Sequence, residues 1–69
     1  MNNNAKEVAA QKIGALIEKA HIAYIESVLE HGVHSSTVNL IGAYIGGLEM
    51  AFQEVVEMPY ALWLQSKII

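Results

Sequence analysis

Apolar side chains recur at helical spacing along this chain and divide it into segments. The first segment, from Ala5 to Glu30, is predicted to be a helix because residues three or four apart align on one side of it. Its main apolar face consists of Ile13, Leu16, Ile17, Ala20, Tyr24 and Val28. The second segment runs to Glu57, and its broader apolar face consists of Val38, Ile41, Ile45, Leu48, Phe52, Val55 and Val56. The pattern predicts two amphipathic helices.

Residues at the segment ends indicate where these helices begin and end. Asn4 is predicted to cap the first helix, with Glu7 three residues later as in a capping box. Gly32 is predicted to end that helix, because glycine tolerates the left-handed conformation of a helix C-terminus. The second helix is predicted to start at Ser35 or Ser36, since serine is a preferred N-cap residue.

A proline near the C-terminus separates a third segment from the second. Pro59 disfavours helical geometry in the preceding residue and is tolerated at the first position of a new helix. We therefore predict a short third helix from Pro59 to Lys67, which presents Tyr60, Trp63, Leu64 and Ile68. The expected fold class is all-α: a helical hairpin plus a short C-terminal helix, in a single small helical domain that spans residues 1–69.

A second apolar stripe on the first helix predicts self-association. Ile22, Ile25 and Leu29 lie apart from the main apolar face, and one hairpin partner can cover only one of the two stripes. The chain has 69 residues, is 54% hydrophobic and only 16% charged, and contains no cysteine for disulfides. Because so short a chain rarely builds a sufficient core alone, we expect a homodimer or higher oligomer, assembled as a helical bundle.

Small residues four positions apart mark one part of the second helix. Gly42 and Gly46 form one such pair, and Gly47 pairs with both Ala43 and Ala51. A glycine inside a helix costs about 0.5–1 kcal/mol relative to alanine, so these positions require a reason. One explanation is the close approach of another helix, and the other is a groove in which a ligand lies against bare backbone. The sequence leaves both open.

Residues 31–48 carry no formal charge and begin with a polar turn. Helix N-termini offer free N–H groups and the positive end of the helix dipole, which favour anions. We expect a ligand-binding site around this turn and the glycines, formed by His31, His34, Ser35, Ser36, Thr37, Asn39, Gly42 and Gly46. The simpler alternative is a serine cap beside exposed histidines. A zinc site at His31, His34 and Glu30 is a weaker hypothesis because an obvious fourth ligand is lacking.

Aromatic residues near the C-terminus are typical of an interface, because such side chains dominate binding hot spots. The expected partner or oligomer interface consists of Ile22, Ile25, Leu29, Tyr44, Gly47, Phe52, Tyr60 and Trp63. An equal alternative for Trp63 is that it closes the core of the chain's own oligomer.

Charge and motif content argue against several functional classes. The net charge is −3 and the chain has no arginine, so nucleic acid is not an expected partner. The apolar stretch at residues 33–48 contains polar residues and is followed by glutamates, so we expect neither a membrane span nor a membrane partner. We expect a cytoplasmic location. His21 is interpreted as a boundary residue. No serine and histidine pair has an orienting carboxylate at a specific spacing, so we expect no enzyme activity, no metal and no cofactor.

One local resemblance points to a regulatory role. The segments Leu16–Lys19 and Ile22–Val28 resemble the first helical segment of phage late-transcription coactivators. The resemblance implies binding to a host transcription component.

Two binding functions are consistent with these observations, and a purely structural assembly subunit is the third hypothesis. The first is a non-enzymatic homo-oligomeric binding protein, of phage or mobile-element type, which captures and sequesters a small anionic or nucleotide-like ligand in pockets between subunits. The alternative is a small regulator or inhibitor that binds a host protein, such as a transcription component, through exposed aromatic and apolar helix faces.

Overall fold

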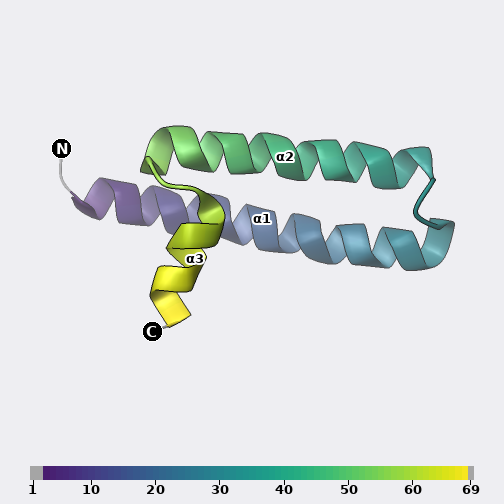
Figure 1. Ribbon diagram of the computed structural model, residues 1–69, viewed down its shortest axis with the longest axis horizontal. Coiled ribbons are helices and arrows are strands. Elements are labelled where there is room, and N and C mark those ends of the chain that lie inside the picture. Colours follow the sequence, from purple (N-terminus) through teal and green to yellow (C-terminus); the bar gives the residue numbers. More distant parts are fainter. Residues whose placement is uncertain (1–2, 69) are drawn as a thin grey trace.

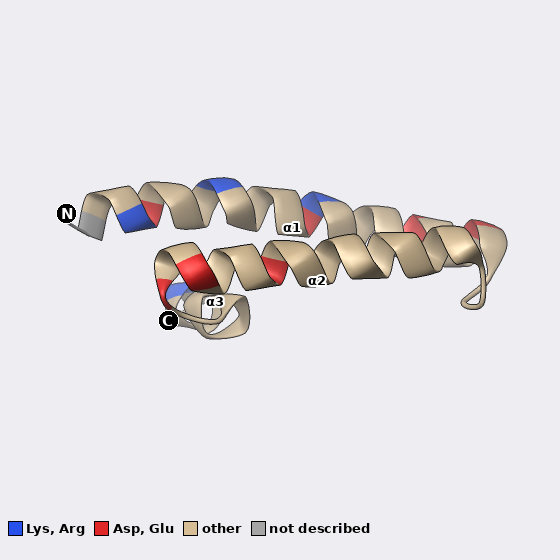
Figure 2. Ribbon diagram, turned by 90° about the horizontal axis from the view of Figure 1, so that it is seen from above, with Lys and Arg blue, Asp and Glu red and all other residues tan. Residues whose placement is uncertain are grey.

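The computed structural model describes residues 3–68, which form three helices: α1 (Asn3–His31), α2 (Ser36–Val56) and α3 (Tyr60–Ile68). The long helices α1 and α2 run antiparallel as a hairpin (Figure 1). The short helix α3 lies across one face of this hairpin, on the half that is farther from the connecting turn (Figures 1 and 2). The described residues contain helices and their connecting turns but no strand, which confirms the all-α prediction.

A narrow seam of side chains holds α1 against α2. Positions seven apart are buried on both helices, with Ala10 and Ile17 on α1 facing the seam and Val38, Ile45 and Phe52 on α2. This spacing is the one that keeps a stripe of apolar residues turned toward a neighbouring antiparallel helix. Because only this stripe is covered, the predicted apolar faces are broader than the buried ones. Leu16, expected on the main face of α1, is 46% exposed.

The N-terminal cap predicted for α1 is wrong. The helix already includes Asn3, so Asn4 lies inside the first turn and does not cap it. The Glu7 carboxylate does not fold back on the helix end; instead it accepts hydrogen bonds from Lys67 Nζ at 2.7 Å and from Gln11 Nε2 at 3.4 Å. The hydrogen bond from Lys67 is charge-assisted and is therefore stronger than a bond from a neutral backbone N–H group. This explains why the Glu7 carboxylate binds Lys67.

The turn between α1 and α2 follows its local sequence closely. Gly32 has φ +86° and donates its N–H to the Val28 carbonyl at 2.8 Å, so it ends the helix as predicted. Of the two serines, Ser35 is the N-cap of α2. Its Oγ accepts hydrogen bonds from the backbone N–H groups of Thr37 at 3.0 Å and Val38 at 3.5 Å. Hydrogen bonds among neighbouring residues therefore define both helix ends at this turn.

The link between α2 and α3 contains a strained residue. Glu57 is left-handed, with φ 65°, and donates its N–H to the Gln53 carbonyl at 2.9 Å. A non-glycine residue in this region carries a conformational cost of roughly 1–2 kcal/mol. An ion pair between Glu57 and Lys6 ties this link to α1. Pro59 follows, and α3 begins at Tyr60, one residue later than predicted.

Helix α3 is anchored by two aromatic rings that pack over a glycine of α1. A Cβ atom at Gly14 would lie 3.4 Å from Tyr60 Cε1 and 3.5 Å from Trp63 Cζ3. The same rings meet Phe52 edge-on, with centroids 5.2 Å and 5.5 Å away. Phe52 is fully buried and joins Ala10 and Ile17 in the core cluster. Only a small residue at position 14 leaves room for these two rings to lie this close to α1.

This contact predicts opposite outcomes for two substitutions at Gly14. Gly14→Ala adds a methyl group at ordinary contact distance and removes the glycine cost, so we expect equal or higher thermal stability. Gly14→Leu should push Tyr60 and Trp63 away, and the emission of Trp63, the chain's single tryptophan, should shift to longer wavelength. An unchanged emission spectrum in Gly14→Leu would contradict this account of how α3 docks.

Candidate functional site

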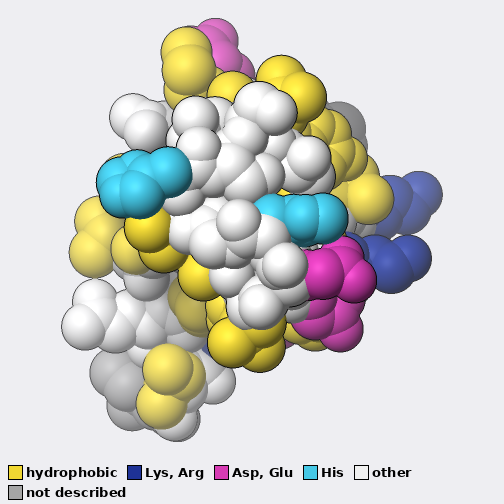
Figure 3. Space-filling view, turned by 90° about the vertical axis from the view of Figure 1, so that its right-hand side faces the viewer, with side chains coloured by type: hydrophobic (Ala, Val, Ile, Leu, Met, Phe, Trp, Pro, Cys, Tyr) yellow, Lys and Arg dark blue, Asp and Glu magenta, His cyan; other side chains and the backbone are white. Residues whose placement is uncertain are grey.

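The polar residues of the turn gather at the loop end of the hairpin, but only some are available to a ligand. Figure 3 views this end and shows histidine side chains at separate positions on its surface. His31 Nε2 lies 3.2 Å from Glu30 Oε1, and both His31 and His34 are exposed. The Ser35 hydroxyl is occupied by the helix cap and engages two of the N–H groups that an anion would use. The hydroxyl-bearing residues Ser36 and Thr37 are exposed.

The expected ligand-binding glycines do not lie with these polar residues. Gly46 is ten residues beyond the start of α2, about 15 Å along the helix axis at 1.5 Å per residue. Gly42 faces the ring of Tyr24, whose Cε2 lies 3.5 Å from the position of an added Cβ. Asn39 is exposed on α2, between the polar residues of the turn and the two glycines. The structure therefore divides the expected site between the loop end and the middle of the hairpin.

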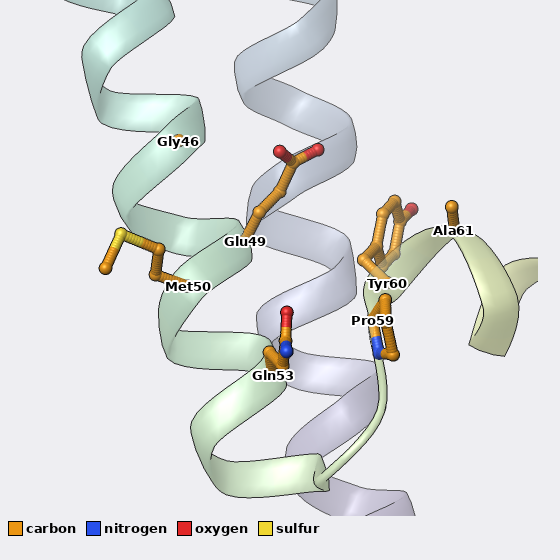
Figure 4. A pocket seen from close by; sticks show the side chains of 7 residues that line it. All are labelled: Gly46, Glu49, Met50, Gln53, Pro59, Tyr60 and Ala61. Carbon is orange, nitrogen blue, oxygen red and sulfur yellow. The ribbon is translucent and has the colours of Figure 1, made fainter.

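Gly46 borders a cavity of about 310 Å³ between α2 and the start of α3. Its lining consists of Gly46, Glu49, Met50, Gln53, Pro59, Tyr60 and Ala61. Figure 4 shows the Glu49 side chain directed toward Tyr60, while Met50 points away. Burial, followed by the negative charges of Glu18 and Glu49, raises the pKa of the Tyr60 hydroxyl. An anion in this cavity would be repelled by the carboxylate of Glu49, which also disfavours the ionised form of Tyr60.

The residues around this cavity do not form a metal centre. His21 Nε2 lies 3.9 Å from Glu49 Oε2, so the two groups attract when the histidine is protonated. Within residues 3–68, no group of three or more His, Asp or Glu side chains is placed to hold a metal ion.

The loop half of the hairpin carries an apolar hollow that we call the loop-end groove. It has a volume of about 240 Å³ and is lined by Tyr24, Ile25, Val28, Leu29 and Val33. No charged residue is among these. Ile22, Ile25 and Leu29, the second stripe expected from the sequence, are all exposed, and Leu29 reaches 83%. Val33 was not expected at the site; it enters because the turn at Gly32 brings it back beside α1.

The other expected interface residues fall into two groups. Tyr44 and Gly47 are exposed on α2, and no atom lies within 4 Å of a Cβ added at Gly47. Phe52, Tyr60 and Trp63 instead pack on one another within the chain. The rings of Tyr60 and Trp63 lie over Gly14, which is not among the residues expected at the interface. A glycine on the edge of an apolar helix face was the available signal, but nothing local connects it to aromatics nearly fifty residues later.

A polar contact secures the outer end of α3. Lys67 Nζ bonds Glu7 and lies 5.3 Å from the centroid of the Trp63 ring. The lysine holds the pKa of the Glu7 carboxyl below its usual value of 4.5, mainly by its hydrogen bond. The nearby Trp63 side chain lowers this pKa further, although its buried Nε1 has no partner at full hydrogen-bonding geometry. The contact links the first turns of α1 to the end of α3.

Comparison with models of known protein families, with curated proteins and with solved structures finds no match to this chain. The local resemblance to late-transcription coactivators therefore gains no support from a family match. No helix among the described residues has both the length and the apolar character needed to cross a membrane.

The Glu7 contact predicts how the docking of α3 depends on pH. The pKa of Glu7 is lowered in the folded chain, so the Glu7 contact stabilises the fold fully above about pH 4.5. This stabilisation is lost as the pH falls through the pKa that Glu7 has in the folded chain. We expect Trp63 fluorescence to change on acidification below about pH 4.5. In Glu7→Gln the spectrum should already be altered at neutral pH.

The control for this titration is Glu54→Gln, which removes an exposed carboxylate on α2. Glu57 also has a lowered pKa, owing to Lys6, and it titrates in all three proteins. Only a difference between Glu7→Gln and the other two proteins therefore reports on the contact. Superimposable fluorescence titrations for wild type and Glu7→Gln would show that Glu7 does not hold α3.

Proposed function

We propose that this chain is a non-enzymatic protein-binding module, a small regulator that engages an apolar segment of another protein at the loop-end groove. The observation that carries the proposal is the combination of a hollow lined only by uncharged side chains with the high exposure of Leu29 beside it. Apolar surface of this kind is stabilised by burial, at about 25 cal/mol per Å². An exposed apolar hollow is thus typical of a site where a partner docks.

The geometry of the groove indicates the chemistry of the partner segment. The exposed residues Ile22, Ile25 and Leu29 follow one side of α1 at spacings of three and four. A helix that carries apolar side chains at the same spacings can lie along such a ridge, with one side chain entering the groove. Because no charged side chain lines the hollow, the segment is recognised by shape and apolar contact, and charged residues of the partner belong at its rim.

Protein binding agrees better with the local chemistry than catalysis does. Ser35, which directly follows His34, uses its oxygen to cap α2. The carboxylates beside Tyr60 lie in the other half of the molecule, next to α3. A binding role requires only the surface that the hairpin already exposes.

The proposal predicts that a charge at position 29 abolishes partner binding. Leu29→Glu changes an exposed residue, so the free energy of unfolding should change by no more than about 0.5 kcal/mol. Immobilised wild type should retain a stoichiometric protein from a lysate of the source organism, and Leu29→Glu should not. Ile68→Glu is the matched control, because Ile68 is similarly exposed but lies on α3. Equal retention by all three proteins, or by none, would contradict the proposal.

Capture of a small anionic or nucleotide-like ligand is a second candidate. The supporting observation is that Ser36 and Thr37, both exposed, lie at the start of α2, whose first turn contains no acidic residue.

Thermal denaturation tests this second candidate directly. With a Kd of about 0.1 mM, a nucleotide at about 1 mM would add about 1.4 kcal/mol of stability, and Tm would rise by several degrees. We expect such a rise with AMP, ATP or inorganic phosphate, and its loss when Ser36→Ala is combined with Thr37→Val. Identical Tm values with and without each compound would exclude this function.

A further inference from the structure

We infer that the outer face of α2 is the docking surface for a second copy of this chain, whose α2 packs against it in the antiparallel direction. This outer face consists of Leu40, Ala43, Tyr44, Gly47, Met50 and Ala51, with Glu54 at its α3 end, all of which are exposed. It lies on α2 alone, whereas the loop-end groove is built from α1 and the turn. The inference therefore goes beyond the proposed function and can fail separately from it.

The outer face combines small residues with large exposed apolar ones. The small residues Ala43, Gly47 and Ala51 are four apart and lie along its middle. Leu40 and Met50, each 72% exposed, and Tyr44 stand beside them. Gly47 has open space where a Cβ would lie. Two helices can approach closely along small residues, and the large neighbours then pack across the contact.

The chain exposes more surface than a compact monomer of its size. A compact monomer of 7.6 kDa is expected to expose about 4,300 Å². This chain exposes 5096 Å², an excess of about 800 Å², which is the area that each partner buries in a protein interface of standard size. The radius of gyration, 13.6 Å, likewise exceeds the value of about 11 Å for a compact domain of this length.

The charges on α2 select the antiparallel direction. Its acidic residues, Glu49 and Glu54, lie in the half nearer α3, and the loop half is uncharged (Figure 2). A parallel pair would place Glu54 beside Glu54 of the second copy. An antiparallel pair centred on Gly47 places Glu54 opposite Leu40, near the positive end of the other helix dipole.

The same register also pairs complementary sizes. Ala43 meets Ala51 of the second copy, so the two backbones can approach closely on both sides of Gly47. Tyr44 meets Met50 of the second copy, and a methionine sulfur beside an aromatic ring is a favourable contact. Each contact occurs twice, as the two-fold symmetry of a homodimer requires.

Adjacent glycines provide a matched pair of variants to test this surface. Gly46 and Gly47 both lie inside α2, and a Cβ at either position meets no atom within 4 Å. Glutamine at either position therefore has the same effect on helix propensity, but only Gly47 lies in the inferred contact. We expect sedimentation to show that the wild-type chain is a dimer and that Gly46→Gln dimerises with a Kd within about threefold of the wild-type value. The Gly47→Gln dimer should be at least roughly a hundredfold weaker, because substitutions at an interface centre dominate affinity.

Cysteine crosslinking tests the direction, because the natural chain has no cysteine. A mixture of Ala43→Cys and Ala51→Cys should form the mixed disulfide under mild oxidation, whereas neither variant should crosslink to itself. Self-crosslinking of Ala43→Cys would overturn the antiparallel arrangement.

The sedimentation results have equally definite meanings. A wild-type chain that remains monomeric at millimolar concentration, or a dimer that Gly47→Gln does not weaken, would overturn the inferred surface. Equal weakening by Gly46→Gln would do so too. None of these results bears on the loop-end groove, because the effect of Leu29→Glu on partner retention is measured independently.

Discussion

The pairing of α1 with α2 along a single narrow seam determines most of what this molecule can do. Two antiparallel helices cover only one stripe of each other, here the positions seven apart that end with Phe52. More than half of the residues are hydrophobic, so many apolar side chains cannot enter this seam. They remain on the surface as a direct consequence of the hairpin geometry. The exposed faces are therefore part of the fold, and a partner can stabilise the chain by covering them.

The short helix α3 relieves this constraint over half of the hairpin only. Its two aromatic rings pack over Gly14 and against Phe52, and Lys67 fastens its far end to Glu7. Helix α3 has nine residues and lies across the hairpin, so it does not cover the half that contains the turn (Figure 1). The loop half thus keeps its apolar hollow open. A hollow of the same volume, about 240 Å³, borders Gly14, but its lining includes the charged residues Glu18 and Lys67, which have no counterpart in the loop-end groove.

Features set by local sequence could be predicted, and those set by distant contacts could not. Gly32, Ser35 and Pro59 define helix ends through the conformations and hydrogen bonds of their immediate neighbours, and the structure places the ends within one residue of the expected positions. The capping role expected for Glu7 was wrong because Lys67, sixty residues away, attracts its carboxylate. Leu16 was expected in the core because helical spacing identifies an apolar side but does not fix how wide a strip the neighbour covers.

The candidate site shows the same division. The stripe of Ile22, Ile25 and Leu29 was visible in the sequence because it is periodic within one helix. The groove beside it depends on how Val33 returns after the turn, which is a property of the tertiary structure. The expected ligand site combined residues that are close in sequence, from His31 to Gly46. An α-helix separates such residues along its axis, so nearness in sequence did not become nearness in space.

The two apolar surfaces lie on different helices, and this has a consequence for binding. In an antiparallel dimer formed through the outer face of α2, the two turns lie at opposite ends of the assembly. Each loop-end groove would then remain open, because α1 and Val33 take no part in the contact. Such a dimer would present two identical grooves facing different partner segments. Binding would gain from both grooves at once only where a partner is itself dimeric or long enough to reach from one end to the other.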